Sequence, residues 1–468
     1  MLKLISKTFL IAMGLFLITS CDGLLDTTPA DAIDPETAQE NVQGIEAILT
    51  STYNRLQAVA RYGRVLVLSP DILADNTDQH PVTSGRGDAL SVNSQGSHMQ
   101  FWNTAYLTIN EANYVIEGSE TTDAPQPVRD RLQGEALFLR GHTYFDLART
   151  YGYEPGREVN GWTEGAIIRT RATRDLADAD FRSRSTNTET YAQALSDLED
   201  ALPLLTTGDR GVYFASYPAA NALLARLHLY LENWQDAIDY ADEAIATTSA
   251  SLVDSEAAFI SNPFDQLPNP ESVYELNIDP VEEAIFSNNS LCGWTNPRHW
   301  HDVTPSQNLL DLFDVNDWRN HLFAEAPDDN NPSPLNMYTL KWDCTHGTTD
   351  DNIPLIRLPE LYLIKAEAHA ELNQFTEALD ALETLQTARG LAPFVSSDQN
   401  EIIDEIIVER RRELHFEGHR FFDLKRRAMD ISKQQGATTV PNDDFRILSP
   451  LPQSEVDNNP QLNQNPGY

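Results

Sequence analysis

The body of the chain lacks a long apolar run. No stretch beyond residue 21 approaches the roughly 20 apolar residues that a transmembrane helix needs. The chain also lacks the nucleophile elbow, the P-loop, the dinucleotide-binding fingerprint and the zinc-protease signature of common enzyme classes. We therefore expect no catalytic residue, no cofactor and no metal, although 71 acidic residues leave a paired-carboxylate hydrolase open as an alternative.

Positive charge is scarce as well. The chain has 33 Lys and Arg against 71 Asp and Glu, a formal net charge of -38, and only 6 of the 33 basic residues are lysine. Such a charge repels nucleic acid and anionic lipid surfaces, so we expect neither as a partner. A dense carboxylate surface with few lysines also indicates adaptation to high external salt, which would screen the self-repulsion.

The first 21 residues predict a bacterial lipoprotein signal peptide. Lys3 and Lys7 precede an apolar run at residues 9–18, which has the size of a signal-peptide core. An aliphatic residue, two small residues and Cys21 follow, in the pattern of a lipoprotein cleavage site. We expect acylation of Cys21, because several acyl chains anchor a protein where one chain binds only marginally. An ordinary secretory signal with an incidental cysteine is the alternative.

Two segments related by a shift of 141 residues predict a tetratricopeptide-type helical repeat. Residues 224–237 align with residues 365–378, so that the aromatic Trp234 matches Phe375 and small alanines match one another. Small residues let two antiparallel helices approach, and the aromatic fills the gap at their turn. A mostly α fold follows, in which each repeat buries its apolar face on its neighbours.

The same periodicity predicts the remaining organisation. Further helices are expected at residues 37–60, 99–117, 128–151, 191–205 and 401–428. Loops are expected at residues 65–97, and an insertion on one face of the repeats at residues 152–188. The predicted blocks are a signal peptide (1–20), a tether (21–36), N-terminal helices and repeats (37–249), a loop-rich lobe (250–355) and C-terminal repeats with a tail (356–468).

The loop-rich lobe at residues 250–355 differs in composition from its neighbours. It is rich in Pro, Asn and Asp, and it holds four of the 7 tryptophans, which argues against disorder. Cys292 and Cys344 also lie in it, and two cysteines outside the cytoplasm can pair, although two free thiols remain the alternative. We interpret this block as a second lobe that is packed against the helices and binds a ligand.

Five ordered motifs resemble the SusD/RagB family. They lie at residues 134–152, 222–246, 356–372, 409–427 and 448–468. The run ERRRELHFEGHRFFDLKR and the ending QNPGY carry most of the resemblance. It implies a mostly helical, tetratricopeptide-like scaffold, a surface lipoprotein of the outer membrane, and a SusC-like, TonB-dependent transporter that the protein covers as a lid. The Pro- and Asn-rich tail at 448–468 is itself expected to be frayed.

Tryptophans beside polar residues predict a sugar-binding site, because aromatic faces stack on sugar rings while polar groups bond the hydroxyls. The candidates in the loop-rich lobe are Trp294, Arg298, Trp300, Trp318 and Trp342. The resemblance implies that loops of the N-terminal part face the same ligand, which adds Asp75, Asn76, Asp78 and Trp102. The alternative is that the tryptophans belong to the hydrophobic core, since tryptophan is usually buried.

Two histidine pairs invite a metal interpretation that we do not adopt. His415 and His419 are four apart, but Phe416 occupies the place of the glutamate that a zinc-protease helix needs. His299 and His301 flank a tryptophan without a clearly spaced acidic ligand. The arginines at 410–412 are expected to pair with glutamates of their own helix.

The sequence thus predicts a surface lipoprotein that binds a nutrient, an oligosaccharide or polysaccharide fragment, and delivers it to an outer-membrane transporter. A surface glycosidase and a helical-repeat adaptor for peptide or protein are the alternatives.

Overall fold

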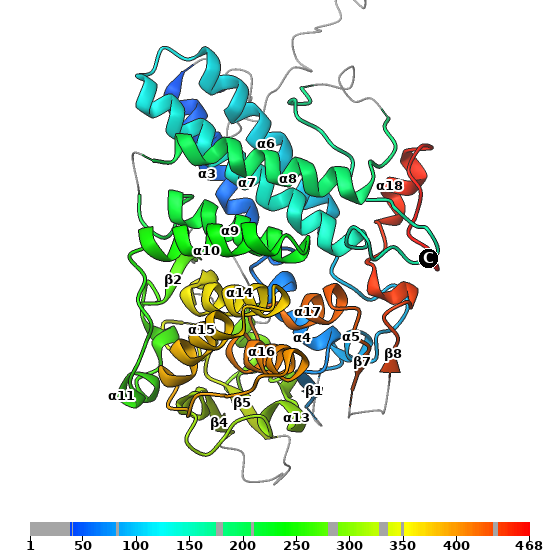
Figure 1. Cartoon of the computed structure of the whole chain (residues 1–468). Coiled ribbons are helices and arrows are strands. Elements are labelled where there is room, and N and C mark those ends of the chain that lie inside the picture. The colour runs from blue at the N-terminus through cyan, green and yellow to red at the C-terminus, as the bar shows by residue number, and fades with distance from the viewer. Residues whose placement is uncertain are drawn as a thin grey trace, which may run out of the picture.

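The structure is a computed structural model. It describes residues 38–39, 41–80, 84–174, 181–206, 210–278, 289–326, 336–347, 351–433 and 439–468. The predicted signal peptide, Cys21 and the tether lie outside these residues. The described part is a stack of antiparallel helix pairs with a region of short strands and helices against one end (Figure 1).

The helix pairs form a continuous stack. Its long helices are α3 (Val42–Gln57), α6 (Trp102–Thr121), α7 (Gln126–Tyr151), α8 (Asn187–Ala201), α9 (Tyr217–Tyr230), α10 (Trp234–Thr247), α14 (Leu358–Glu371), α15 (Phe375–Thr387) and α16 (Gln399–Glu413), and the short α17 (Arg420–Arg426) follows α16. Successive helices contact one another from α3 through α6, α7, α8, α9 and α10, and α10 then packs on α14 although about a hundred residues separate them in the sequence. The predicted mostly α, repeat-based fold is confirmed.

The 141-residue repeat extends to the turns between the helices. Glu232 ends the α9–α10 turn with φ 58°, and Asn373, at the equivalent place between α14 and α15, has φ 61°. His228 Nδ1 lies 3.2 Å from Asn233 Nδ2, and the equivalent His369 Nδ1 lies 2.6 Å from the Gln374 side chain. Each histidine therefore contacts the N-cap residue of the next helix, and the two turns share this contact.

The irregular region joins distant parts of the chain through short antiparallel strand pairs. β1 (Thr77–Gln79) pairs with β3 (Val303–Pro305), β2 (Ser272–Leu276) with β6 (Ile353–Arg357), β4 (Phe323–Glu325) with β5 (Met337–Thr339), and β7 (Ile431–Ser432) with β8 (Thr439–Val440). The shorter helices are α4 (Val65–Leu73), α5 (Asp88–Ser91), α11 (Glu256–Ile260), α12 (Leu291–Thr295), α13 (Gln307–Leu310) and α18 (Gln453–Asn458), with 3-10 turns at η2 (Leu202–Leu204), η3 (Pro263–Asp265), η4 (Trp318–Leu322) and η6 (Phe445–Ile447).

Two predicted segment types are wrong. The loop expected at 65–97 begins with the buried helix α4, whose nearly continuous apolar face packs on α17. The helix expected at 401–428 is two helices, because Phe416 and Gly418 adopt φ 60° and 84° between them. A Cβ at Gly418 would lie 2.2 Å from the Leu66 carbonyl oxygen, so glycine allows α4 to approach this turn.

The arginines at 410–412 mostly bond other elements and not their own helix, contrary to the intrahelical pairing expected. Arg410 bonds Asp423 of α17 at 3.1 Å, and Arg411 donates to the Asn76 side chain at 2.7 Å. Among the described side-chain contacts of these three arginines, those of Arg412 are intrahelical, to Glu405 at 2.6 Å and to Glu409 at 2.9 Å. The interior position of α16 makes the difference, since intrahelical pairs dominate only on exposed faces.

Glu413 is the centre of a buried ion network. Its carboxylate bonds Arg389 at 2.8 Å, Arg357 at 2.9 Å and Arg319 at 3.0 Å, and it is 3% exposed. Burial by itself would raise the pKa of Glu413, but the three guanidinium charges hold the pKa well below its usual range. These arginines come from the end of α15, the end of β6 and from η4, so one carboxylate ties the irregular region to the repeats.

The C-terminal tail is packed, so the expectation that it frays is wrong. Asn465 is 1% exposed, and its amide donates to the carbonyl oxygens of Tyr151 at 3.0 Å and Ser449 at 2.7 Å. Its side-chain oxygen accepts a bond from Arg184 at 2.7 Å. The tail therefore closes the end of α7 by hydrogen bonds that its composition does not reveal.

We predict that Glu413→Gln lowers the free energy of unfolding by about 3 kcal/mol at neutral pH, because three buried guanidinium groups lose a shared anion. Since folding lowers the pKa of Glu413, its contribution is complete above the unfolded value of about 4.3 and declines as pH falls toward the lower folded pKa. Urea unfolding at pH 7 and pH 3 checks both points. The exposed Glu377→Gln is the matched control, and equal stabilities of the two variants at pH 7 would refute the prediction.

We predict that Asn465→Ala lowers the free energy of unfolding by about 1–3 kcal/mol, since it leaves buried groups of Tyr151, Ser449 and Arg184 without their partner. Asn463→Ala is the control, because that side chain is exposed two residues away. Thermal unfolding of both variants checks this, and a tail that frays would give no difference between them.

Candidate ligand-binding site

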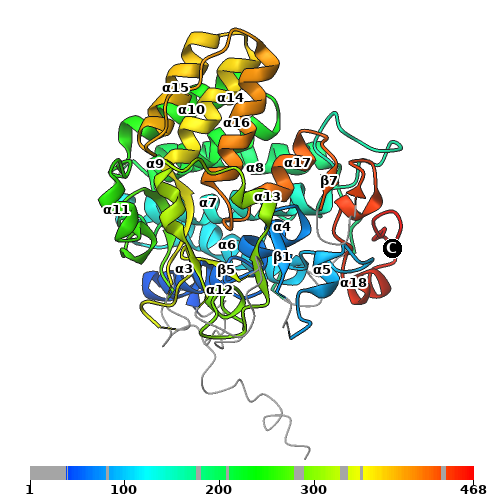
Figure 2. The same ribbon diagram turned by 90° about the horizontal axis from the view of Figure 1, so that it is seen from below.

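α12 and the turn after it carry two of the predicted tryptophans. Ser290 caps α12 by accepting a hydrogen bond from the Gly293 amide at 2.9 Å. Trp294 lies inside the helix and is 5% exposed, whereas Trp300 lies in the following turn and is 52% exposed. Seen from below, α12 lies with β5 at the edge opposite α15 and α16 (Figure 2).

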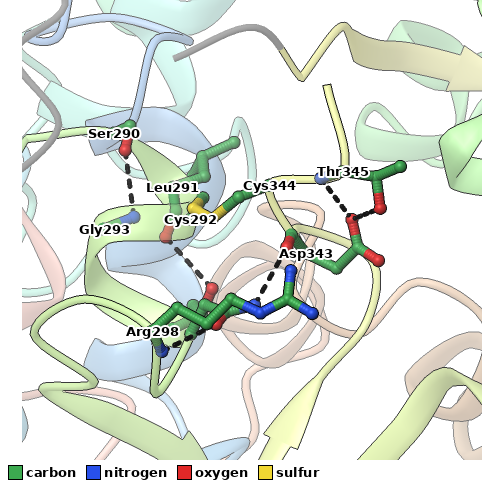
Figure 3. Close-up of a disulfide and its surroundings, with 10 residues drawn as sticks. Ser290, Leu291, Cys292, Gly293, Arg298, Asp343, Cys344 and Thr345 are labelled. Carbon is green, nitrogen blue, oxygen red and sulfur yellow. Dashed lines mark hydrogen bonds between the residues drawn. A yellow bond between two sulfur atoms is a disulfide. The ribbon is translucent and has the colours of Figure 1, made fainter. Parts of the chain in front are cut away.

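A disulfide fixes this segment. Cys292 and Cys344 are bonded, with their Cα atoms 5.7 Å apart (Figure 3). The Asn296 amide adds a second link, because it donates to the Asp343 carbonyl oxygen at 3.1 Å. The turn that presents Trp300 is thus tied at its start to the segment before β6.

Two arginines that the sequence did not single out stack on these rings. The Arg86 guanidinium carbon lies 5.0 Å from the Trp294 ring centre and 5.2 Å from the Trp300 ring centre. The Arg64 guanidinium carbon lies 4.4 Å from the Trp294 ring centre. Cation–π contacts of this length are attractive and orient both partners. We call Trp294, Trp300, Arg64 and Arg86 the tryptophan–arginine surface.

The β1–β3 pair brings the N-terminal loop to this surface. Arg86 Nε donates to the Asp302 carboxylate at 3.0 Å, and the Ser84 hydroxyl donates to the same carboxylate at 2.7 Å. His80 and His301 stack at 4.5 Å between ring centres. Burial, together with His80, lowers the pKa of His301 to about 4, so this imidazole is neutral at physiological pH.

Asp75, Asn76 and Asp78 lie beneath the loop and bond within the protein. Asp75 accepts from Arg420 at 2.7 Å; burial would raise its pKa, but the arginine bonds and charges lower it below its usual range. Asn76 is fully buried and donates to Asp71 at 2.7 Å. Asp78 is 6% exposed within β1. These side chains position the loop, and we do not include them among the ligand-contacting residues.

The other predicted residues of the loop-rich lobe divide between core and surface. Trp342 is 1% exposed and donates to the Phe416 carbonyl oxygen at 3.0 Å. Trp318 is half-buried against Phe259 and Leu322. Both tryptophans therefore follow the core interpretation. Arg298 is exposed beside the disulfide, where only its backbone amide makes a described bond, to Asn296 at 2.9 Å (Figure 3).

Trp102 belongs to a different place. It lines a cavity of about 590 Å³ between α6, residues 167–173 with Phe181, and α18. Tyr106, Leu107 and Asn110 also line it, but no residue of the tryptophan–arginine surface does. The structure therefore separates Trp102 from Trp294 and Trp300, which the sequence analysis had grouped in one site.

The histidine pairs make contacts that explain them without a metal. His415 is buried, bonds the Arg412 carbonyl oxygen at 2.7 Å and stacks on Phe323. His299 lies close to Cys292 and Cys344, a set whose ligand atoms fall within 4.8 Å. Both sulfurs are joined to each other, however, and the thiolate is the form of cysteine that binds metals.

Two protein-family models match this chain. The model described as starch-binding and associating with the outer membrane matches residues 25–229, and the SusD family model matches residues 334–468. The chain belongs to the SusD/RagB family. The predicted family is thereby confirmed.

Relatives in the SusD/RagB family match the whole chain or a part of it. SusD-like protein P38 of Formosa agariphila is 26% identical over 519 residues, which cover 100% of this chain and 99% of that protein. The starch-binding protein SusD of Bacteroides thetaiotaomicron is 32% identical over 134 residues, or 26% of this chain and 23% of that protein. A crystal structure of a SusD superfamily protein from the same species has a TM-score of 0.81 at 26% identity, covering 91% of this chain and 100% of that one.

The two SusD/RagB family models leave residues 230–333 between them unmatched, and this interval contains Trp294 and Trp300. Trp294 and Trp300 thus lie outside both matched intervals, whereas Arg64 and Arg86 lie within residues 25–229. Within the described residues, none of the helices combines the length and apolar character needed to cross a membrane.

Proposed function

We propose that the protein captures carbohydrate at the outer membrane and that the tryptophan–arginine surface is its binding site. The exposed indole of Trp300 is the observation that carries the proposal, because it is the one tryptophan of the predicted set that is more than half exposed. A flat aromatic face in water favours an apolar partner, and the C–H faces of sugar rings offer one.

The rigidity of the surface supports a binding role. The Trp300 ring contacts Arg86, and the turn that carries Trp300 is tied at its start by the disulfide. A preorganised aromatic loses little conformational entropy when a ligand stacks on it, which favours binding. The arginine and histidine side chains beside the rings supply donors for hydroxyl groups.

Membership of the SusD/RagB family supports the cellular setting. The family model at residues 25–229 is described as starch-binding and associated with the outer membrane, and SusD of Bacteroides thetaiotaomicron is named a starch-binding protein. We propose that acyl chains on Cys21 anchor the protein at the cell surface. It would then act as a lid that passes cargo to a SusC-like, TonB-dependent transporter.

We predict that Trp300→Ala weakens glycan binding about tenfold or more without changing the melting temperature, since truncation of a ligand-stacking tryptophan typically costs more than about 1 kcal/mol. Calorimetric titration with a panel of oligosaccharides checks this. Phe181→Ala is the matched variant, because Phe181 is a similarly exposed aromatic, 58%, at the Trp102 cavity.

Loss of binding in Phe181→Ala but not in Trp300→Ala would place the ligand in the Trp102 cavity and refute the proposed site. Release of new reducing ends during the titrations would favour the glycosidase alternative. Glycan binding by neither protein nor variants, with a peptide bound instead, would favour the adaptor alternative.

We predict that a tagged protein, purified from native outer membranes in mild detergent, retains a large TonB-dependent barrel protein. The Cys21→Ala variant is the control, because it removes the proposed acylation site and should leave the protein out of the membrane fraction. Recovery of the lipoprotein without a barrel would contradict the proposed partnership.

A further inference from the structure

The tryptophan–arginine surface is basic in a protein that is otherwise strongly acidic. The chain carries a formal net charge of -38, yet Arg64 and Arg86 lie on the same indole ring, that of Trp294. Among the described residues, the carboxylate that contacts this pair is Asp302, which bonds Arg86. Both guanidinium groups therefore lie on one buried indole ring beside the exposed Trp300, and Arg86 bonds Asp302.

The surroundings of Arg64 are electrically unfavourable for its own charge. Its described hydrogen bonds go to Asn289, through the carbonyl oxygen at 3.3 Å and the side-chain oxygen at 3.0 Å. Burial, and after it the charge of Arg86, lower the pKa of Arg64 to about 10, and the charge of Asp302 offsets only part of this. An anion placed here would relieve that repulsion, whereas a neutral group would leave it unchanged.

Arginine is also the residue whose geometry suits such an anion. Its planar guanidinium forms paired hydrogen bonds to carboxylate and to oxyanions of the sulfate and phosphate type. Because Arg86 contacts the rings of both Trp294 and Trp300, its guanidinium group is held beside the exposed indole. A sugar on Trp300 would therefore bring a substituent of its ring within reach of a fixed cationic group.

We propose that this surface takes an anionic glycan, one whose sugar rings carry carboxylate or sulfate groups. The inference rests on the proposed function, because it assumes that Trp300 stacks on sugar. It goes further because it proposes that the two arginines bind the negatively charged groups of the ligand. At ionic strengths near 0.15 M charges beyond about 8 Å are largely screened, so the charged groups nearest to a ligand on Trp300 act on it most strongly.

The test compares three oligosaccharides of equal length: a galacturonic acid tetramer, a sulfated carrageenan tetramer and maltotetraose. Titration calorimetry of the full mature protein at 0.15 M NaCl measures their affinities. We expect at least one anionic tetramer to bind about tenfold or more tightly than maltotetraose. The carboxylate and sulfate arms distinguish which anion the surface prefers.

Variants of Arg64 connect the selectivity to the surface. Arg64→Gln should remove most of the preference for the anionic tetramer, and Arg64→Lys, which keeps the charge, should lose less. Arg157→Gln is the matched control. It also removes one positive charge from the protein, but at an exposed arginine that bonds Glu232 and does not belong to the tryptophan–arginine surface. Circular dichroism and melting temperatures establish whether each variant is folded. If Arg64→Gln does not fold, the ratio of the wild-type affinities for the anionic tetramers and maltotetraose still tests the inference.

Each outcome decides a separate point. Equal or tighter binding of maltotetraose by the wild type would overturn the anionic-glycan inference and leave carbohydrate capture intact. Anion selectivity that Arg64→Gln and Arg157→Gln reduce equally would also overturn it, since the surface would then not be the source. Binding of no tetramer, by wild type or variant, would overturn the proposed function together with the inference.

Discussion

The rest of the structure depends on one buried carboxylate. Glu413, at the end of α16, binds arginines from η4, β6 and α15, which are far apart in the sequence. Arg357 and Arg389 also bond Glu271, just before β2, so the network extends into the β2–β6 pair. Removing a single member would leave buried charges without a partner, so the network is stable only when all its members are present. The network thereby joins the stack of helices to the irregular region, which has few strands.

The network also fixes the direction in which the irregular region faces. Trp342 and Lys341 bond backbone carbonyl oxygens of the turn after α16, and the next residues lead to Cys344. The disulfide links Cys344 to Cys292 in α12, so it also fixes the position of α12 and of the turn that carries Trp300. A chain of specific contacts therefore runs from the scaffold motif at 409–427 to the exposed Trp300, which lies between the intervals that the two family models match.

The helical scaffold could be predicted from the sequence because its signals are local and periodic. A shift of 141 residues aligned not only the alanines and aromatics but also His228 with His369, which turned out to bond the start of the following helix in both copies. Helix α4 was missed because its apolar run is short and is followed by loop-forming residues. The tail was misjudged since its stability comes from Asn465 reaching Tyr151 and Ser449, partners that composition cannot indicate.

The sequence by itself determined the repeat architecture, the resemblance to the family and the enrichment of tryptophan in one block, because each of these is written in residue order. Only the tertiary structure decided which tryptophan meets solvent: Trp342 is buried and Trp318 is half-buried, whereas Trp300 lies exposed on a turn. It alone brought Arg64 and Arg86, more than two hundred residues away, onto the Trp294 ring. The physical reason is that burial and cation–π contact depend on distances across the fold, which no local pattern of side chains encodes.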